Sequence, residues 1–461
     1  APPVEKEQIT YERTKAKPGR KETLPDLPVE VIEHKLPEDE MACECCGGQK
    51  HVMKKNVRRE LKLFPAKAMI IEHVVYVYAC RPCDKEGTEV PITVAPAPKP
   101  VIPRSLASPS SLAHVMTLKY VDGMPLYRQE QYFDRLGITI GRSVLSTWML
   151  KGAEWLELLY EVMKQELRER EVLAADETTV QVLREPCRPA ESQSYMWLYR
   201  TGGGSDPPIV LFDYQMTRSS EHPREFLKGF QGYLHADGYV GYENMPGVTI
   251  VGCWAHARRK FDEAIKALPP NARKNPSKAR EGLNGINSLF KIEQGLKGLS
   301  PQERKEQRDL LSRPKVESFR NWLDSLADAV LPRSALGIAI TYCRNQWPKL
   351  IRFLEDGRLE LDNNRSERSI KPFVMGRKAW LFSNTPRGAR ASAIIYSVVE
   401  TAKENKLNPY EYLKHLFQQM PNVDVKNPDV LQRLLPWNVV LKAEEPSGQA
   451  PPASLAQGQD V

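Results

Sequence analysis

Val172-Leu-Ala-Ala-Asp176 and Gly232-Tyr-Leu-His-Ala-Asp237 are two short, mostly apolar runs that each end in an aspartate. Such runs are typical of buried strands, so we predict strands at 172–175 and 232–236 with both carboxylates at strand termini. Similar runs predict further strands at 194–199, 209–214 and 249–253, and an amphipathic pattern predicts a helix at 221–230. Consecutive strands followed by a helix and more strands indicate a mixed α/β sheet.

Aspartates at neighbouring strand ends suit metal-dependent phosphoryl transfer. This chemistry needs carboxylates from different elements that converge on divalent cations about 3.5 to 4 Å apart. Mg²⁺ prefers oxygen ligands, so Asp176 and Asp237 are candidate ligands if their strands lie side by side. An aspartate at a strand end is also commonly a turn former or a helix cap, and that alternative stays open.

A third carboxylate, Glu367, lies in the polar stretch Leu361-Asp-Asn-Asn-Arg-Ser-Glu-Arg368. The spacing Asn364-x-x-Glu367 also fits a helix cap in which the glutamate folds back onto the backbone. The neighbourhood is denser in polar and basic groups than a cap requires, with Asp362, Asn363, Arg365, Arg368, Lys371, Arg377 and Lys378. Both roles therefore remain possible from the residues alone.

The 461 residues are enough for two to four domains, and they carry a net charge of +8 with a pI near 8.9. Basic residues occur in clusters, such as Lys54, Lys55, Arg58, Arg59 and Lys62, which suit a polyanionic partner. A solvated face is the simpler explanation of any single cluster. Because the chain has neither a membrane-length apolar run nor an apolar signal core at its start, we expect a soluble, intracellular protein.

Residues 111–170 have a helical periodicity with breaks at Asp122-Gly-Met-Pro125 and at Gly137. A helix, a short glycine turn and a second helix that begins at Arg142 form the pattern of a helix-turn-helix. This pattern predicts a helical DNA-binding region. Two helices packed as a plain hairpin are the alternative.

Cys43-Glu-Cys-Cys46 and Cys80-Arg-Pro-Cys83 are two CxxC pairs on either side of strand-like runs within 61–78. Four thiolates at this spacing predict one tetrahedral Zn²⁺ site, with Cys43, Cys46, Cys80 and Cys83 as ligands. Four buried free thiols are the alternative, and Cys45 is an extra thiol that could compete for the metal. Core packing is the expectation for the isolated Cys187, Cys253 and Cys343.

Several segments carry a resemblance to a known family: Ala174–Val182, Leu234–Tyr239, Gly252–Phe261, Leu361–Arg368 and Gly376–Phe382. Together with the CxxC pairs and Asp122–Glu130, they resemble the transposases of bacterial insertion-sequence family 66 over residues 40 to 440. The resemblance implies a ribonuclease-H-like core whose Asp, Asp, Glu triad is Asp176, Asp237 and Glu367, with Mg²⁺ or Mn²⁺ as cofactor. Ala174, Thr179 and Ala379 depart from the family pattern without removing a metal ligand.

We therefore expect a multi-domain α/β protein with a ribonuclease-H-like mixed-sheet catalytic core at 171–261 and 357–415 and a helical insertion at 262–356. The other expected parts are a flexible arm (1–40), a zinc-binding module (41–93), an Ala/Pro linker (94–110), the helical DNA-binding region (111–170), a C-terminal segment (416–444) and a flexible tail (445–461).

The function implied by the resemblance is that of a DNA transposase, which cleaves transposon ends and transfers the strand into target DNA. Its implied partners are terminal inverted repeats, target DNA, further copies of the chain and small accessory proteins, in the cytoplasm with the bacterial nucleoid. The expected phosphate contacts are Arg142, Arg258, Arg259, Arg368, Lys371, Arg377 and Lys378. His256 could orient a ligand or contact DNA, and a buried, satisfied histidine is the alternative. Two alternatives are a DNA-binding regulator without catalysis and a nuclease that cuts without joining.

Overall fold

The computed structural model describes residues 68–79, 92–204, 206–326 and 329–441. The chain divides into two units, 1–67 and 68–461, and only the second contains described residues. The predicted zinc ligands, the arm and the tail lie outside the described residues. Strands were expected within 61–78. Among the described residues there, only Val77 and Tyr78 belong to a strand, β1 (Val77–Ala79), and 68–76 form none. Strand β1 pairs with β2 (Ile92–Val94).

A five-stranded sheet forms the centre of the second unit, in the order β5-β4-β3-β6-β7. Its strands are β3 (Val172–Gln181), β4 (Gln193–Thr201), β5 (Val210–Gln215), β6 (Gly232–His235) and β7 (Val248–Val251). The pairs β3–β4 and β4–β5 are antiparallel, whereas β3–β6 and β6–β7 are parallel. The predicted mixed α/β sheet is confirmed, and all five predicted strands lie within two residues of their expected starts.

One expectation about the central strand was wrong: Asp176 lies within β3 and not at its end. The antiparallel partner β4 pairs with β3 from Leu173 to Gln181, so the polar residues after Asp176 continue the strand. The parallel partner β6 is shorter and pairs only with Val172–Ala174. Asp176 is therefore mid-strand on the β4 side and just past the last paired residue on the β6 side.

Before the sheet come α2 (Pro109–Tyr120), α3 (Leu126–Arg135) and α4 (Arg142–Arg168). The predicted breaks between them are confirmed, with Gly123 and Gly137 at φ values of +71° and +76° that favour glycine. Val101 and Ile102 are buried, and Trp155 of α4 donates a hydrogen bond to the Val101 carbonyl at 2.9 Å. The segment after β2 is thus anchored to α4 before α2 begins.

Helix α12 (Pro386–Glu404) covers the free edge of β5, and our sequence analysis assigned no element there. Ser397 and Thr401, one turn apart, accept hydrogen bonds from the backbone N–H groups of Phe212 and Val210 at 2.8 and 3.0 Å. Thr401 also donates to the Val210 carbonyl at 2.9 Å. These hydroxyls satisfy backbone groups of β5, the outer strand of the five-stranded sheet. An outer strand with unpaired backbone groups would promote aggregation.

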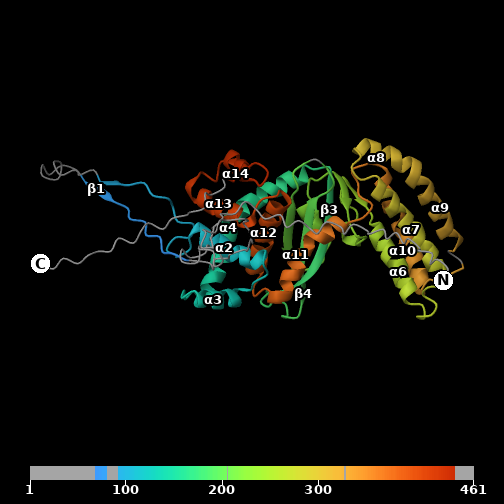
Figure 1. The fold of residues 1–461 in the computed structure, drawn as a ribbon, viewed down its shortest axis with the longest axis horizontal. Helices are drawn as coiled ribbons and strands as arrows, with labels where there is room; N and C mark the ends of the chain where they lie inside the picture. The colour runs from blue at the N-terminus through green and yellow to red at the C-terminus, as the bar shows by residue number, and fades with distance from the viewer. Residues whose placement is uncertain (1–67, 80–91, 205, 327–328, 442–461) are drawn as a thin grey trace, which may run out of the picture. The chain divides into compact units, whose positions relative to one another are not determined.

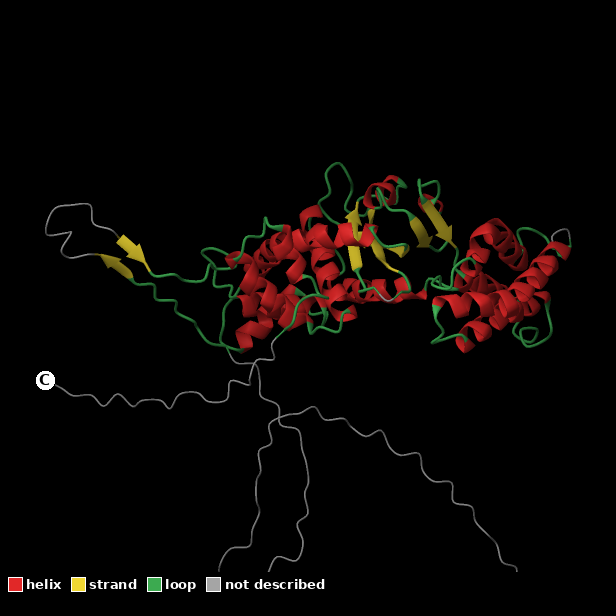
Figure 2. Cartoon of the chain, turned by 90° about the horizontal axis from the view of Figure 1, so that it is seen from above, coloured by secondary structure: helices red, strands yellow, loops and turns green. Residues whose placement is uncertain are grey.

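The remaining helices fall into two sets. Helices α5 (Glu221–Phe226), α13 (Pro409–Gln419) and α14 (Pro428–Leu434) accompany the core, and the predicted helix at 221–230 ends at Phe226. The helices between β7 and α11 are α6 (Trp254–Lys266), α7 (Lys278–Gly295), α8 (Pro301–Gln307), α9 (Arg313–Ser325) and α10 (Ala335–Leu350), so the expected insertion at 262–356 begins within α6. Helix α12 packs at the β5 side and α10 at the β7 side, so the sheet lies between two groups of helices (Figures 1 and 2).

Two buried arginines join distant parts of this unit. Arg308 forms a two-pronged ion pair with Glu293 and donates to the carbonyls of Phe353, Asp356 and Leu359, which fixes the end of the insertion.

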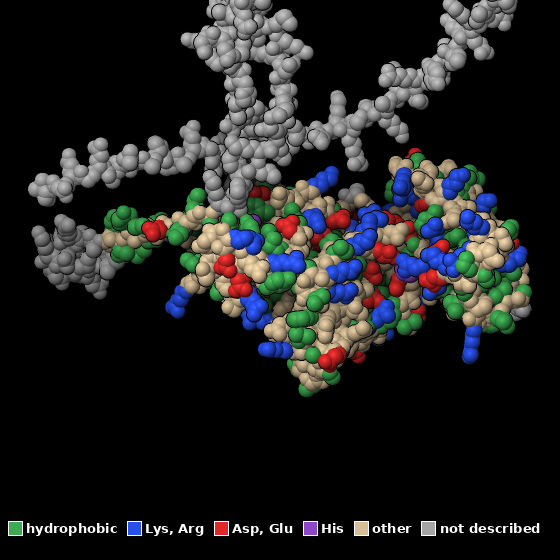
Figure 3. Space-filling model, turned by 60° about the horizontal axis from the view of Figure 1, so that its bottom comes forward, with side chains coloured by type: hydrophobic (Ala, Val, Ile, Leu, Met, Phe, Trp, Pro, Cys, Tyr) green, Lys and Arg blue, Asp and Glu red, His purple; other side chains and the backbone are tan. Residues whose placement is uncertain are grey.

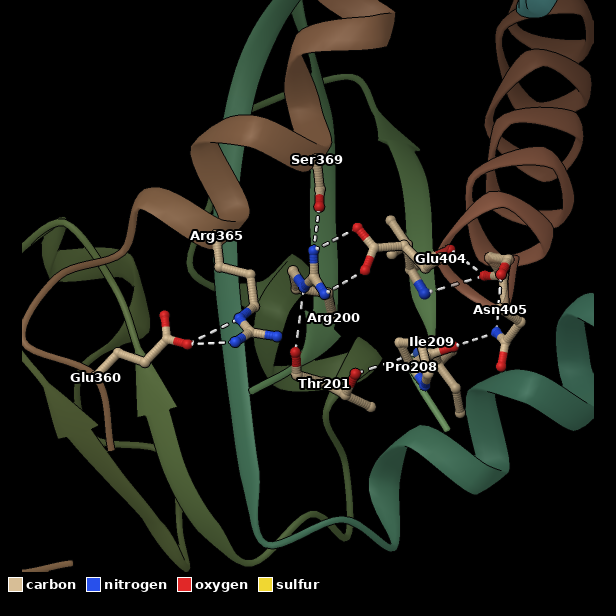
Figure 4. A network of polar contacts seen from close by, with 11 residues as sticks. Arg200, Thr201, Pro208, Ile209, Glu360, Arg365, Ser369, Glu404 and Asn405 are labelled. Carbon is tan, nitrogen blue, oxygen red and sulfur yellow. Dashed lines mark hydrogen bonds and ion pairs between the residues drawn. The ribbon is translucent and has the colours of Figure 1, made fainter. Parts of the chain in front are cut away.

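Arg200 of β4 bonds Ser369 and pairs with Glu404 at 3.2 Å (Figure 4). Ser369 belongs to α11 (Asn364–Trp380) and Glu404 to α12, so Arg200 ties both helices to the sheet.

Among the described helices, none combines the length and apolar composition needed to cross a membrane.

We predict that Arg200→Met lowers the free energy of unfolding by about 2–4 kcal/mol, because Arg200 is buried and its loss leaves Ser369 and Glu404 without their partner. Thermal unfolding of the full chain measures this. The control Arg313→Met removes an exposed ion pair with Asp309 and should change stability by less than about 1 kcal/mol. Equal shifts in the two variants would contradict the role assigned to Arg200.

Candidate active site

The register of two parallel strands brings Asp176 and Asp237 to the same end of the sheet. Ala174 of β3 pairs with His235, the last residue of β6, and each aspartate follows its paired residue by two positions. The charge of Asp237 acts on the Asp176 carboxyl, so the two side chains lie in one neighbourhood. After His235 the backbone of Ala236 still bonds to the Val251 carbonyl at 3.1 Å, which keeps the chain extended up to Asp237.

The loop after Asp237 is held by the insertion. Asp237 Oδ1 accepts a hydrogen bond from the Tyr239 backbone at 2.9 Å, and Gly238 has a φ of +101°. Tyr342 of α10 donates its hydroxyl to the Asp237 carbonyl at 3.0 Å. A Cβ on Gly238 would lie 3.2 Å from the Gln346 side chain. Helix α10 therefore packs directly against the backbone that presents Asp237.

Glu367 lies in the first turn of α11, and the segment before this helix is tied to the sheet. The Asn363 side chain donates to the Ala175 carbonyl at 2.8 Å, and the Asn363 backbone N–H donates to Cys253 Sγ at 3.2 Å. The carbonyl of Leu361 accepts from the Trp254 backbone at 3.1 Å. These bonds bring the start of α11 to β3 next to Asp176.

The capping alternative for Glu367 is not the one adopted. Asn363 is the N-cap residue of α11, but its side chain makes no capping hydrogen bond, and the Asp362 carboxylate accepts from the Asn364 N–H at 3.0 Å. Glu367 instead turns toward α6, with Oε1 3.5 Å from Arg259 Nη2 and 4.0 Å from His256 Nε2. Its carboxylate is about one-third exposed and points to the region that also contains the two aspartates.

The three carboxylates share one electrostatic environment. Burial, followed by the charges of Glu177, Asp237 and Glu367, raises the pKa of Asp176 to about 8, although a hydrogen bond from the Glu177 N–H acts in the opposite direction. A carboxyl group surrounded by like charges is relieved by a cation, so the donor set suits a hard divalent metal. Among the described residues, however, no three His, Cys, Asp or Glu side chains are close enough to enclose a metal ion.

Basic side chains flank this region on α6 and α11. Arg259 faces Glu367, Arg258 donates to Asn287 of α7 at 2.7 Å, and Arg377 donates to Thr179 of β3 at 3.1 Å. Arg368, Lys371 and Lys378 are exposed on α11, whereas Arg142 is exposed on a separate element at the start of α4. Figure 3 shows a face on which many Lys and Arg side chains surround a smaller group of acidic ones.

The remaining predicted residues divide between core and surface. Cys253 and Cys343 are buried, as expected. Cys187 is exposed, so the prediction that it packs in the core was wrong; it follows Pro186 and has a φ of +59°. Burial raises the pKa of the Cys253 thiol to about 12. His256 is partly buried, with Nδ1 unpaired among the described residues, and burial followed by the charge of Arg259 lowers its pKa.

Two charged neighbours of the site were not identified from the sequence. Glu177, beside Asp176, accepts hydrogen bonds from Tyr242 at 2.6 Å and from Arg218 Nε at 2.8 Å. Its position next to Asp176 was a usable signal. Arg218, in the loop between β5 and α5, had none, because only the topology brings that loop to this edge.

Three protein-family models match the chain. "Transposase IS66 family" matches residues 104–391, and "IS66 C-terminal element" matches residues 397–437. The "zinc-finger binding domain of transposase IS66" matches residues 40–84, which include both CxxC pairs. The first match alone covers more than half of the chain and includes every described candidate residue.

The chain is also similar to three curated proteins of Sinorhizobium fredii (strain NBRC 101917 / NGR234), each of which is described as uncharacterized. It is 30% identical to y4jD over 86% of this chain and 78% of that protein. It is 30% identical to y4hP over 92% and 77%, and 31% identical to y4qI over 89% and 75%. The family matches and these relatives show that the chain belongs to the IS66 family of transposases.

Proposed function

We propose that this protein is a DNA transposase that uses Asp176, Asp237 and Glu367 for metal-dependent cleavage at transposon ends and for strand transfer into target DNA. The observation that carries the proposal is the parallel register of β3 and β6, which pairs Ala174 with His235, two residues before Asp176 and Asp237. The charge of Asp237 acts on the Asp176 carboxyl, as expected for neighbouring side chains. The Asn363 bond to Ala175 supports the third position, because it docks the helix that carries Glu367. Family membership adds the class of reaction.

The sheet supports a ribonuclease-H-like core. Three antiparallel strands are followed along the chain by two strands parallel to the first, which lies at the centre. The proposed carboxylates come from this central strand, from the end of the adjacent parallel strand, and from a helix packed on β3 and β4. The helical insertion separates the last strand from that helix.

Asp176, Asp237 and Glu367 would hold Mg²⁺ or Mn²⁺, for which their oxygen-only donor set and shared negative charge are suited. Bound there, the cation supplies Lewis-acid stabilisation of a reacting phosphodiester. The protein's own contribution is to present Asp237 from a loop braced by α10 and to hold Asp176 where burial opposes its ionisation. A cation bound there would displace the proton from Asp176 and offset the negative charges that act on it.

DNA is the proposed substrate and partner, held through phosphate contacts. Of the six basic residues on α6 and α11, Arg259 faces Glu367 and Arg377 bonds Thr179 of β3, while Arg368, Lys371 and Lys378 are exposed on α11. The first turns of α4 expose Arg142, Ser143, Val144, Ser146 and Thr147, while Leu145 and Trp148 are buried. This exposed face after the Gly137 turn supports a DNA contact by the proposed helix-turn-helix. Oligomerisation on DNA, accessory proteins and association with the nucleoid follow from the resemblance alone.

We predict that Asp176→Asn, Asp237→Asn and Glu367→Gln each reduce Mg²⁺-dependent cleavage of element-end DNA by at least about 100-fold. The reaction should be followed on labelled end DNA with a target plasmid, which resolves cleavage from joining. Glu263→Gln, an exposed carboxylate on α6, is the matched control and should remain active. Full cleavage by any triad variant would overturn the assignment, and cleavage without joining by the wild type would favour the nuclease.

We also predict that Asp176→Asn stabilises the metal-free protein. Asp176 has a raised folded-state pKa of about 8 against an ordinary 3.8, so the folded state binds the proton more tightly and loses stability as pH rises between these values. Asparagine removes that cost, so the melting temperature in EDTA should exceed that of the wild type near pH 8. The difference should shrink toward about pH 4.5, and a pH-independent difference would contradict this cause.

The two CxxC pairs are proposed to bind zinc, as the zinc-finger match supports. We predict about one zinc per purified chain by elemental analysis, lost in Cys83→Ser because a tetrahedral site needs all four thiolates. Cys45→Ser is the matched control, since Cys45 lies inside the first pair and should not be required. Zinc retained by Cys83→Ser would show that this thiolate is not a required ligand.

A further inference from the structure

Arg218 lies at the same edge of the sheet as the proposed catalytic carboxylates. Strands β3, β5, β6 and β7 run in one direction, so their carboxyl ends lie at the same end of the sheet. Open α/β sheets commonly bind ligands at this end. Asp237 follows β6 there, and Arg218 follows β5, ahead of α5. The loop at Arg218 thus reaches the site from the side opposite to α6 and Arg259.

The Arg218 guanidinium is held firmly in place. Its Nε and Nη2 both donate to Oε1 of Glu177, the former at 2.8 Å. Its Cζ lies 3.9 Å from the centre of the Tyr239 ring, and the Tyr239 hydroxyl donates back to the Arg218 carbonyl. Tyr239 is two residues after Asp237, so the same short segment presents the carboxylate and supports the arginine.

Despite these contacts, the Arg218 side chain is 41% exposed. Its Nη1 makes no hydrogen bond within the part of the chain that the structure describes. Burial lowers the pKa of Arg218, but the hydrogen bond to Glu177 and the charges of Glu177 and Asp237 outweigh that effect. The pKa of Arg218 is therefore raised. A fixed, charged guanidinium with one free edge is suited to bind a phosphate.

A purely structural role for Arg218 would be to neutralise Glu177. The Glu177 side chain is 3% exposed, and an unpaired buried carboxylate is costly. Glu177 also accepts a hydrogen bond from Tyr242, however, and it contacts Arg218 through only one of its oxygens. The ion pair therefore leaves Nη1 of the guanidinium without a partner among the described residues. A role in neutralising Glu177 alone does not explain this free group.

We propose that Arg218 binds a backbone phosphate of the DNA strand next to Asp237, and so keeps that strand aligned with the carboxylates. The inference rests on the proposed function and extends it by assigning a substrate-binding residue from the β5–α5 loop. Arg259, which faces Glu367, would flank the same strand on the other side. Glu177 and Tyr239 are then positioning residues that hold Arg218.

The test is DNA binding without metal, measured by fluorescence anisotropy of a labelled duplex from the element's end over a range of KCl concentrations. Loss of one phosphate contact reduces the slope of log K against log [salt] by about one and weakens binding roughly 3- to 10-fold. Arg218→Gln should show both effects, whereas Arg218→Lys should retain part of the affinity. The control Arg224→Gln makes the same charge change at an exposed position on α5 and should bind like the wild type.

The double variant Glu177→Gln/Arg218→Gln separates binding from neutralisation. If Arg218 contacts phosphate, the double variant still binds weakly, although its melting temperature recovers toward that of the wild type. Wild-type affinity in the double variant would overturn the proposal, as would an unchanged salt slope in Arg218→Gln or an equal loss in Arg224→Gln. Because this assay needs no cleavage, failure of catalysis in the wild type would count against the proposed function and not against Arg218.

Discussion

One hydrogen bond, from the Asn363 amide to the Ala175 carbonyl, determines how the site is assembled. Asn363 occupies the N-cap position of α11, where its side chain would ordinarily satisfy the helix's own N–H groups. It bonds the central strand instead, at the carbonyl that precedes Asp176 and lies beyond the residues paired with β6. The Asn363 side chain therefore does not cap α11. It fixes the first turn of the helix, which contains Glu367, to β3.

Asp176 shows a similar exchange of stability for function. It is half-buried within the strand and close to Glu177, Asp237 and Glu367, so ionisation of its carboxyl is opposed before any substrate binds. A protein selected only for stability would place an asparagine or an apolar residue there, because unpaired buried carboxylates cost free energy. The arrangement is understandable if a cation and a DNA strand complete it.

The sequence predicted the strands well because their apolar runs are interrupted by polar turns, and Asp237 was placed correctly for that reason. It missed the second half of β3, since Asp-Glu-Thr-Thr has no apolar pattern and is strand only because β4 pairs with it. Helix α12 was missed because it is buried on nearly every side from Ala389 to Ala402 and has no polar face. Glu367 had a genuine local alternative, and Arg218 had no local signal, since both positions depend on contacts far along the chain.

The insertion is part of the site and not an appendage to it. Its last helix, α10, bonds the Asp237 carbonyl through Tyr342, and its end bonds the loop after β7 through the Lys349 carbonyl and Gly252 N–H at 3.0 Å. A side chain at Gly252 would be tightly placed, because a Cβ would lie 3.1 Å from the Leu350 backbone nitrogen. The loops after β6 and β7 thus contact residues about a hundred positions later in the chain. Although the insertion separates Glu367 from the last strand along the chain, its last helix therefore contacts the backbone on both loops, after β6 and after β7.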